Sequence, residues 1–390
     1  MDLIDNLANA FAGKEVEKVP AASIVSVALM EGMEKTGAGF PESHTNAEKM
    51  VALGESAHKY AGVESINLPF DLAIEAEAMG CTVDLRDANE HIPEITASPF
   101  FDDLSGVELC DDFLSNGRIP VVAEACQIAR EKYPDVPLIS GQIGPFTLLG
   151  QIVGIEYLMK CLATNPNEVK VAVNKCADAV IEVVKAYNEL DVQGDCMYEP
   201  SIAADLLPPE MFDEIVKYPL KRIADAADFN IVLHVCGDTT PILEHTLDLG
   251  YNGFSFEDCV NVKEANKIKY DLKSNTQLVG NVATDSLFKG DFESIREESF
   301  RALDRGIDIL GSSCCVPPGT PLKAMEVLVK ARDEYYELGK QETRFKNEKA
   351  LSWTPSYIDV PLPVANCHNM PEHEERKIKM VCVDPNDIPI

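Results

Sequence analysis

Short apolar runs rich in β-branched residues recur along most of the chain, and segments with helical periodicity separate them. Buried strands that alternate with helices pair in parallel, because each helix carries the chain back across the sheet. Eight such units predict an α/β fold in which the strands close into a (β/α)8 TIM barrel. The predicted strands are Ile24–Leu29, Ser65–Phe70, Leu138–Gln142, Val192–Tyr198, Ile231–Cys236, Gly253–Glu257, Gln277–Asn281 and Ile307–Gly311. The predicted helices include Pro166–Tyr187, Pro208–Ala227, Thr240–Leu249, Asp291–Arg305 and Pro321–Leu338.

The pattern divides the chain into two parts. Residues 1–340 carry the strand and helix repeats and are expected to form the catalytic barrel domain. From about residue 341 the helical period gives way to pieces separated by prolines, so residues 341–390 are expected to be a proline-rich C-terminal extension. Within the barrel domain, the link from Leu72 to Pro137 is longer than a usual crossover and should contain extra helices.

Composition limits the partners and the compartment. The formal net charge of -31 makes nucleic acid or an anionic membrane surface a poor partner, because phosphate binding needs a basic surface. We find no apolar run long enough to cross a bilayer and no signal-peptide layout at the start, so a cytoplasmic protein is expected. Twelve cysteines in such a chain are expected to be reduced thiols, a few of them metal ligands.

A candidate metal site stands out in this pattern. His234 and Cys236 end the fifth predicted strand, and alternate residues of a strand face the same side. Cys314 directly follows the eighth strand, and barrel enzymes build their sites at the carboxyl ends of strands. Any one of these residues alone could be an ordinary core residue, but together they predict a zinc site. One imidazole and two thiolates leave an open fourth position, as in catalytic zinc sites.

The types of ligand limit the reactions that the metal site could support. Two thiolates bring the formal charge of a zinc site near zero, so the metal is a weak Lewis acid. Such a site lowers the pKa of a bound thiol from about 8.5 and leaves the thiolate electron-rich. The expected reaction is therefore alkyl transfer to sulfur. Glu257 is the tentative fourth ligand of the resting site, and Cys315 competes with Cys314 for the third position.

Polar residues end several other predicted strands. Gln142, Tyr198, Glu199 and Asn281 hold such positions and are candidate substrate-binding residues. The alternative is that each is an ordinary polar residue at the end of a strand.

Several longer motifs occur along the barrel domain. They are His234–Leu243, Leu278–Val282, Cys314–Pro321, Leu68–Asp71, Glu75–Cys81, Gly144–Leu148, Glu199–Ser201 and Asp205–Phe212. Together they resemble the zinc-dependent methylcobamide:coenzyme M methyltransferases of methanogens, which belong to the uroporphyrinogen decarboxylase superfamily, and the resemblance covers about residues 5–338. It implies that His234, Cys236 and Cys314 hold a zinc ion that binds the thiol of coenzyme M for attack on the methyl group of methylcobalamin, presented by a corrinoid protein. Glycine usually follows the last ligand, and Cys315 replaces it here.

Three rival functions stay open. A donor-side methyltransferase of the same superfamily, which methylates a corrinoid protein, would have a similar site. Uroporphyrinogen decarboxylation needs arginines near the first strand, but residues 21–100 carry four Lys or Arg against thirteen acids. A protein that binds a corrinoid protein without catalysis would not need the complete ligand set.

Overall fold

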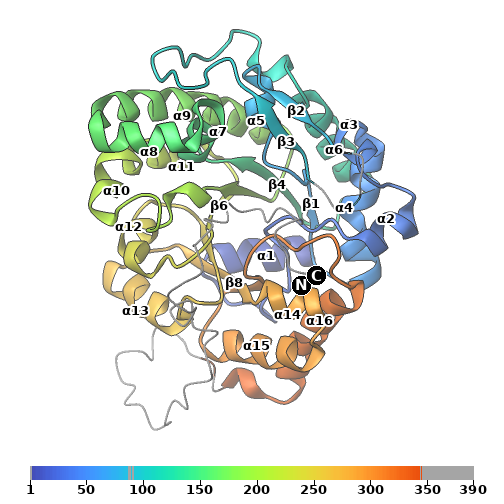
Figure 1. Cartoon of the computed structure of the whole chain (residues 1–390). Helices are drawn as coiled ribbons and strands as arrows, with labels where there is room; N and C mark the ends of the chain where they lie inside the picture. Colours follow the sequence, from blue (N-terminus) through green and yellow to red (C-terminus); the bar gives the residue numbers. More distant parts are fainter. Residues whose placement is uncertain (1, 87–88, 90–91, 343, 345–390) are drawn as a thin grey trace.

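The computed structural model describes residues 2–342 and 344, except 87–88 and 90–91 (Figure 1). Seven parallel strands form one curled sheet, in the order β1-β4-β5-β6-β7-β8-β9. Their helical crossovers cover the outer face of the sheet, as the alternating pattern predicts. From residue 345 on, the predicted C-terminal extension lies outside the described residues. The strands are β1 Ile66–Asn67, β4 Leu138–Ile143, β5 Gly194–Tyr198, β6 Asn230–Val235, β7 Gly253–Phe256, β8 Gln277–Val282 and β9 Ile309–Ser312.

The predicted first strand, Ile24–Leu29, does not form a regular strand. The extended segment 20–27 lies between β9 and β1 and makes only isolated parallel bridges, Ala21 to Leu310 and Val27 to Val316. Side chains from residues 64–67 make some of the backbone hydrogen bonds that a neighbouring strand would otherwise make. Glu64 accepts a hydrogen bond from the Ala21 N–H (2.8 Å), and Asn67 Nδ2 donates one to the Ser23 carbonyl (2.8 Å). This segment therefore occupies the eighth position without the hydrogen-bond pattern of a strand.

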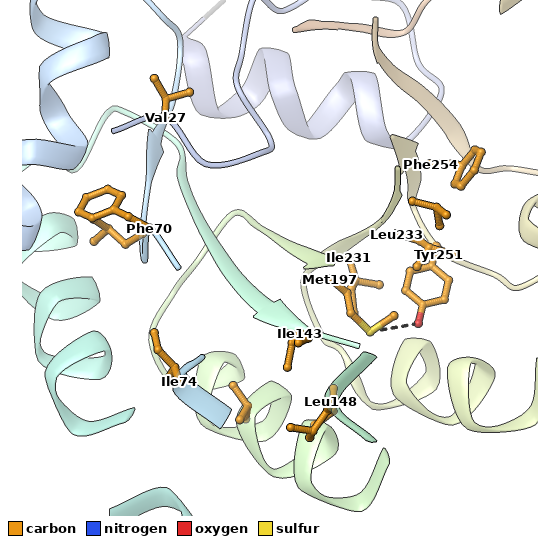
Figure 2. Close-up of a cluster of buried hydrophobic side chains, with 14 of the residues drawn as sticks. Val27, Phe70, Ile74, Ile143, Leu148, Met197, Ile231, Leu233, Tyr251 and Phe254 are labelled. Carbon is orange, nitrogen blue, oxygen red and sulfur yellow. Dashed lines mark hydrogen bonds between the residues drawn. The ribbon is translucent and has the colours of Figure 1, made fainter. Parts of the chain in front are cut away.

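Alternation along the strands separates two buried clusters. Cys196 and Tyr198 of β5 belong to a small cluster inside the curl of the sheet, whereas Met197 belongs to the large cluster between the sheet and the helices. Figure 2 shows part of the large cluster, where the Tyr251 hydroxyl lies 3.6 Å from the Met197 sulfur and also donates to the Leu220 carbonyl (3.0 Å). The same two-residue period decides which strand residues can reach the inner site.

Helix α1 (Leu3–Phe11) closes the inner cluster from the amino-terminal end of the strands. The Asp2 side chain caps the helix by accepting a hydrogen bond from the Asp5 N–H (2.7 Å). Leu7 and Phe11 are buried in the inner cluster. A Cβ at Gly253 would lie 3.2 Å from the Phe11 ring and 2.9 Å from a Val232 methyl, so the packing requires glycine on β7.

The helices agree with the predicted periodic segments, apart from two regions. In the predicted helix Thr240–Leu249, a 3-10 turn precedes a helix of five residues. The other region is 208–227. That region contains α10 (Pro209–Ile215) and α11 (Lys217–Ala226), which are separated at Val216. The other helices are α2 Met30–Thr36, α3 Glu42–Thr45, α4 Ala47–Ala61, α5 Ile74–Ala78, α6 Ile119–Lys132, α7 Pro145–Val153, α8 Ile155–Thr164, α9 Pro166–Asn188, α12 Leu243–Leu247, α13 Val262–Leu272, α14 Thr284–Lys289, α15 Phe292–Asp304 and α16 Leu322–Glu337. Short 3-10 turns occupy Phe113–Ser115, Pro200–Ile202, Thr240–Ile242 and Lys340–Glu342.

The long link between β1 and β4 contains the extra helices α5 and α6, as predicted, and also an antiparallel pair of strands. These strands, β2 (Thr82–Asp84) and β3 (Glu94–Ala97), were not predicted. Their side chains are exposed or half-buried, so they carry no run of apolar residues that would indicate a strand.

Within the described part of the chain, no single helix has the length and apolar composition needed to cross a bilayer. Helices α7 and α8 pass that test only when they are taken as a pair, and they are bent by 109° relative to each other. The ten cysteines in the described residues are all free thiols.

Replacing Phe11 with alanine is expected to destabilise the fold by about 3–5 kcal/mol, because it removes a buried ring and leaves a cavity below the inner cluster. Urea unfolding followed by circular dichroism measures this change. Phe101→Ala is the control, since Phe101 is 66% exposed and its loss should change stability by less than about 0.5 kcal/mol. Equal effects of the two substitutions would contradict the role given to α1.

Candidate metal centre

The side chains of His234, Cys236 and Cys314 meet at the carboxyl-terminal end of the sheet. His234 lies on β6 and Cys236 one residue beyond it, so both face the inside of the curl. Nε2 of His234 lies 3.2 Å from Sγ of Cys236, which lies 3.3 Å from Sγ of Cys314. The three atoms are within 4.8 Å of one another, and all three residues are buried. This spacing suits one shared metal ion, because zinc bonds to nitrogen and sulfur are about 2.0–2.3 Å long.

The neighbouring strands fix the orientation of the imidazole. Ser255 on β7 lies beside His234 in the parallel register, and its Oγ is 2.9 Å from Nδ1. Tyr198 on β5 lies on the other side and meets the imidazole edge to face, with ring centroids 5.7 Å apart. With Nδ1 held by a hydroxyl, Nε2 is the nitrogen that faces the two thiols. Sequence reasoning missed Ser255, although the register of adjacent parallel strands would place it there.

Burial and mutual charge shift the pKa values within this group. Burial lowers the pKa of His234, but the Cys236 thiolate outweighs burial and raises it to about 8. The hydrogen bond from Cys314 and the charge of His234 hold the pKa of Cys236 below its usual value, although burial opposes them. The interactions with Cys236 and Cys315 raise the pKa of Cys314 well above its usual range. Cys236 is therefore the thiol of the group that ionises most readily.

Cys315 lies next to this group but is not one of its members. Its thiol interacts with that of Cys314 and it packs against the inner cluster, yet the three mutually close ligand atoms do not include it. Cys315 is partly exposed and lines a recess in the surface. The recess is otherwise lined mainly by apolar residues, namely Ser26, Ala28, Phe40, Phe70, Ile92, Val316, Pro317 and Pro318.

A buried charge network holds one wall of this recess. Phe40 stacks on His44 with ring centroids 4.2 Å apart, and His44 Nδ1 lies 3.1 Å from Asp71. Arg118 donates two hydrogen bonds to the Asp71 carboxylate (2.7 and 3.1 Å) and one to Glu77 (2.7 Å). Burial raises the pKa of Asp71, but Arg118 and His44 together hold it well below its usual range. The charge of Arg118 is thus compensated within the protein.

Glu257, the tentative fourth ligand, directly follows β7. Burial raises the pKa of its carboxyl, and the Gly237 backbone and the charge of His234 lower it. It lies near enough for its charge to affect the pKa values of His234 and Cys236. The cluster of mutually close ligand atoms, however, does not include the Glu257 carboxylate.

The model of the uroporphyrinogen decarboxylase (URO-D) family matches residues 2–335. The chain belongs to the URO-D family. Among relatives, the methylcobamide:CoM methyltransferase MtaA of Methanosarcina barkeri is 36% identical over 330 residues, which are 84% of this chain and 96% of that protein. The methylcobamide:CoM methyltransferase MtbA of Methanosarcina acetivorans is 30% identical over 339 residues, 85% of this chain and 97% of that protein.

The structure of this URO-D family chain is similar to that of a methyltransferase from Methanosarcina mazei. The TM-score is 0.83 at 34% identity, and the match covers 86% of this chain and 99% of the other. These findings confirm the predicted fold class, the resemblance found in the sequence and the prediction that the chain is a methyltransferase.

Two of the four candidate substrate-binding residues have partners on the outer side of the sheet. Gln142 Nε2 donates to the buried Asp195 carboxylate (2.8 Å). Glu199 accepts hydrogen bonds from the backbone N–H groups of Phe146 (3.0 Å) and Thr147 (2.6 Å), at the first turn of α7. The two carboxylates thus hold the outer side of β4 and β5 to the surrounding structure.

The other two candidates, Tyr198 and Asn281, have different surroundings. Tyr198 contacts the imidazole of His234, as described above. Asn281 Nδ2 lies within hydrogen-bonding reach of the carbonyls of Glu257 (3.4 Å) and Val260 (3.3 Å). Asn281 also lines a polar recess with Asp258 and Arg301, which is distinct from the recess lined by Cys315.

We expect the Glu75→Gln variant to lose less stability than the unmodified protein as the pH rises. Burial, assisted by the charges of Asp71 and Asp195, raises the pKa of Glu75 to about 8 in the folded protein. A carboxyl whose folded pKa exceeds its unfolded value of about 4.3 makes folding less favourable as pH rises through that window. Each pKa unit corresponds to about 1.4 kcal/mol. The free energy of unfolding, measured in urea between pH 5 and pH 8, tests this.

Glu182→Gln is the control for this measurement, because its side chain is 40% exposed. The control should follow the unmodified protein at each pH, whereas Glu75→Gln should gain relative stability toward pH 8. Parallel pH profiles for all three proteins would show that Glu75 does not hold its proton when folded.

Proposed function

We propose that the chain transfers a methyl group from a methylated corrinoid protein to a small thiol, coenzyme M. The observation that carries the proposal is the group formed by His234, Cys236 and Cys314 at the carboxyl-terminal end of the strands. The relatives MtaA and MtbA, named for methyl transfer from methylcobamide to coenzyme M, support it.

The donor set fits zinc. One imidazole nitrogen and two thiol sulfurs match the ligands of catalytic zinc sites that keep a fourth position open. The hydrogen bond between Ser255 and Nδ1 supplies the outer partner that metal-bound histidines have. Zinc bound there would lower the pKa of an incoming thiol, so that the thiolate attacks the methyl group near neutral pH.

The residues of the site would have different roles in the reaction. His234, Cys236 and Cys314 would hold the metal, and the substrate thiol would take the open position. Ser255 and Tyr198 keep the imidazole in place. The recess that Cys315 lines would let the thiol approach the centre, and its mainly apolar lining would disfavour water there. We also keep Gln142, Glu199 and Asn281 as candidate substrate-binding residues and Glu257 as a candidate resting ligand.

The two rival functions of the superfamily predict different reactions. A donor-side methyltransferase would methylate a corrinoid protein and would have no thiol acceptor. A decarboxylase would need free cationic groups for several carboxylates, whereas Arg118 is already paired with Asp71 and Glu77.

His234→Ala should remove both zinc and activity. We expect purified protein to contain about one zinc per chain and to transfer methyl from free methylcobalamin to coenzyme M. Zinc content is measured by atomic emission, and transfer by the loss of methylcobalamin absorbance. The variant should lose most of its zinc and at least about 100-fold of the transfer rate, since even outer partners of metal ligands contribute about 10–100-fold.

His245→Ala is the matched control, because His245 is partly exposed and pairs with Asp213 on the surface. It should keep both zinc and activity. Full turnover without zinc, or methylation of no thiol in a panel of acceptors, would contradict the proposed function.

Ser255→Ala should weaken zinc binding by about 10–100-fold without unfolding the protein, because the imidazole loses the partner of Nδ1. Competition with a chromophoric chelator measures the affinity. Ser299→Ala is the control, since its buried hydroxyl donates to the Ile295 carbonyl (2.7 Å) within α15. Equal zinc affinities for the two variants would show that the contact with Ser255 does not support the metal.

A further inference from the structure

Cys315 supplies a third sulfur beside the three candidate ligands, which are one imidazole and two thiols. Its thiol interacts with that of Cys314, and its charge affects the pKa values of His234 and Cys196. His234 and Cys196 both face the inside of the curled sheet. Cys315 directly follows Cys314 in the chain and packs against the inner cluster, so it lies on the inner side next to the candidate ligands.

Accessibility separates Cys315 from the other sulfurs of the centre. Cys236 and Cys314 are each 5% exposed, whereas Cys315 is half-buried and lines the apolar recess. A thiol that entered through this recess would meet Cys315 before it reached the metal. Of Cys236, Cys314 and Cys315, only Cys315 lines this recess.

We propose that the Cys315 thiolate is the fourth metal ligand while no substrate is bound, and that the substrate thiol displaces it. This inference rests on the proposed function, because it requires zinc in the centre and a thiol substrate. His234, Cys236 and Cys314 form a mutually close set without Cys315, so the metal keeps its three ligands when Cys315 leaves.

The exchange balances in atoms and charge. One zinc–sulfur bond, to Cys315, breaks, and one zinc–sulfur bond, to the substrate, forms. The proton of the substrate thiol passes to the departing Cys315 sulfur. The centre keeps its charge throughout, and no proton enters the solvent. Displacement of a water molecule, in contrast, would release about one proton for each thiol that ionises.

Cys315 suits this role better than Glu257 on two grounds. A thiolate is a softer ligand than a carboxylate and matches the two thiolates already in the set. Cys315 also lines the recess from which the substrate would arrive, whereas the lining residues of that recess do not include Glu257. Glu257 in the fourth position would give a centre with two sulfurs and one oxygen, which experiment distinguishes from three sulfurs.

Zinc K-edge X-ray absorption counts the sulfur atoms at about 2.3 Å from the metal. The zinc-loaded full-length protein should show three sulfurs without substrate, and Cys315→Ser should show two. Addition of 2-mercaptoethanesulfonate should leave the count at three in the unmodified protein and raise it from two to three in the variant. Cys110→Ser, which removes an exposed thiol elsewhere, should match the unmodified protein.

Proton release gives a second, independent measurement. Calorimetric titration with 2-mercaptoethanesulfonate in buffers of different ionisation enthalpy should show release of almost no proton from the unmodified protein. The same titration of Cys315→Ser should release about one proton per bound thiol.

Three outcomes would overturn the inference. Two sulfurs in the resting unmodified protein would exclude Cys315 as a ligand, and an accompanying oxygen would assign the position to Glu257 or water. Loss of zinc from Cys315→Ser would show that the metal requires Cys315 as a permanent ligand, which a substrate could not displace. In both cases normal methyl transfer by the unmodified protein would leave the proposed function intact. Absence of bound zinc or of thiol methylation in the unmodified protein would overturn both.

Discussion

The site depends on the register of three adjacent parallel strands. Tyr198, His234 and Ser255 lie side by side on β5, β6 and β7, because each strand pairs with the next without a shift at these positions. The imidazole is therefore held by an aromatic edge on one side and by a hydroxyl on the other. A slip of one residue in β6 would turn both His234 and Cys236 to the outer side of the sheet. The packing below them, where α1 fills the inner cluster, opposes such a slip.

The same alternation explains the distribution of acidic groups. Asp195 on β5 and Glu199, which directly follows β5, face the outer side of the sheet, as Met197 does, whereas Cys196 and Tyr198 face the inner side. Burial raises the pKa of Asp195 to about 6 and that of Glu199 to about 7, although the hydrogen bonds that each carboxylate accepts lower its pKa. The carboxylates near the sheet are thus partly neutral near pH 7, and they hold β4, β5 and α7 together rather than adding negative charge inside the curl.

Much of this architecture could be predicted from the sequence, because the strands are buried apolar runs and the candidate ligands directly end two of them. Seven of the predicted strands are present, six with small shifts at their ends and one, Ser65–Phe70, shortened to Ile66–Asn67. Segment 20–27 could not be recognised as irregular, since its backbone groups are satisfied by Glu64 and Asn67, and nothing local in the sequence reveals those partners. The sequence also does not show which side of the sheet the residues at the strand ends face. Tyr198 and Glu199 are adjacent, so both could not face the inside, and the sequence alone does not say which one does.

The pattern of charges within the centre connects folding to metal binding. Three buried groups share the inner cluster, and burial disfavours a charge on each of them. His234 and Cys236 favour each other's charged forms, which raises the pKa of His234 and lowers that of Cys236, whereas the pKa of Cys314 is raised. A divalent cation binds neutral imidazole and thiolates, so its binding must displace the protons that these three groups carry. Those protons couple metal affinity to pH, and the positive charge of the metal would offset the buried negative charge of the thiolates.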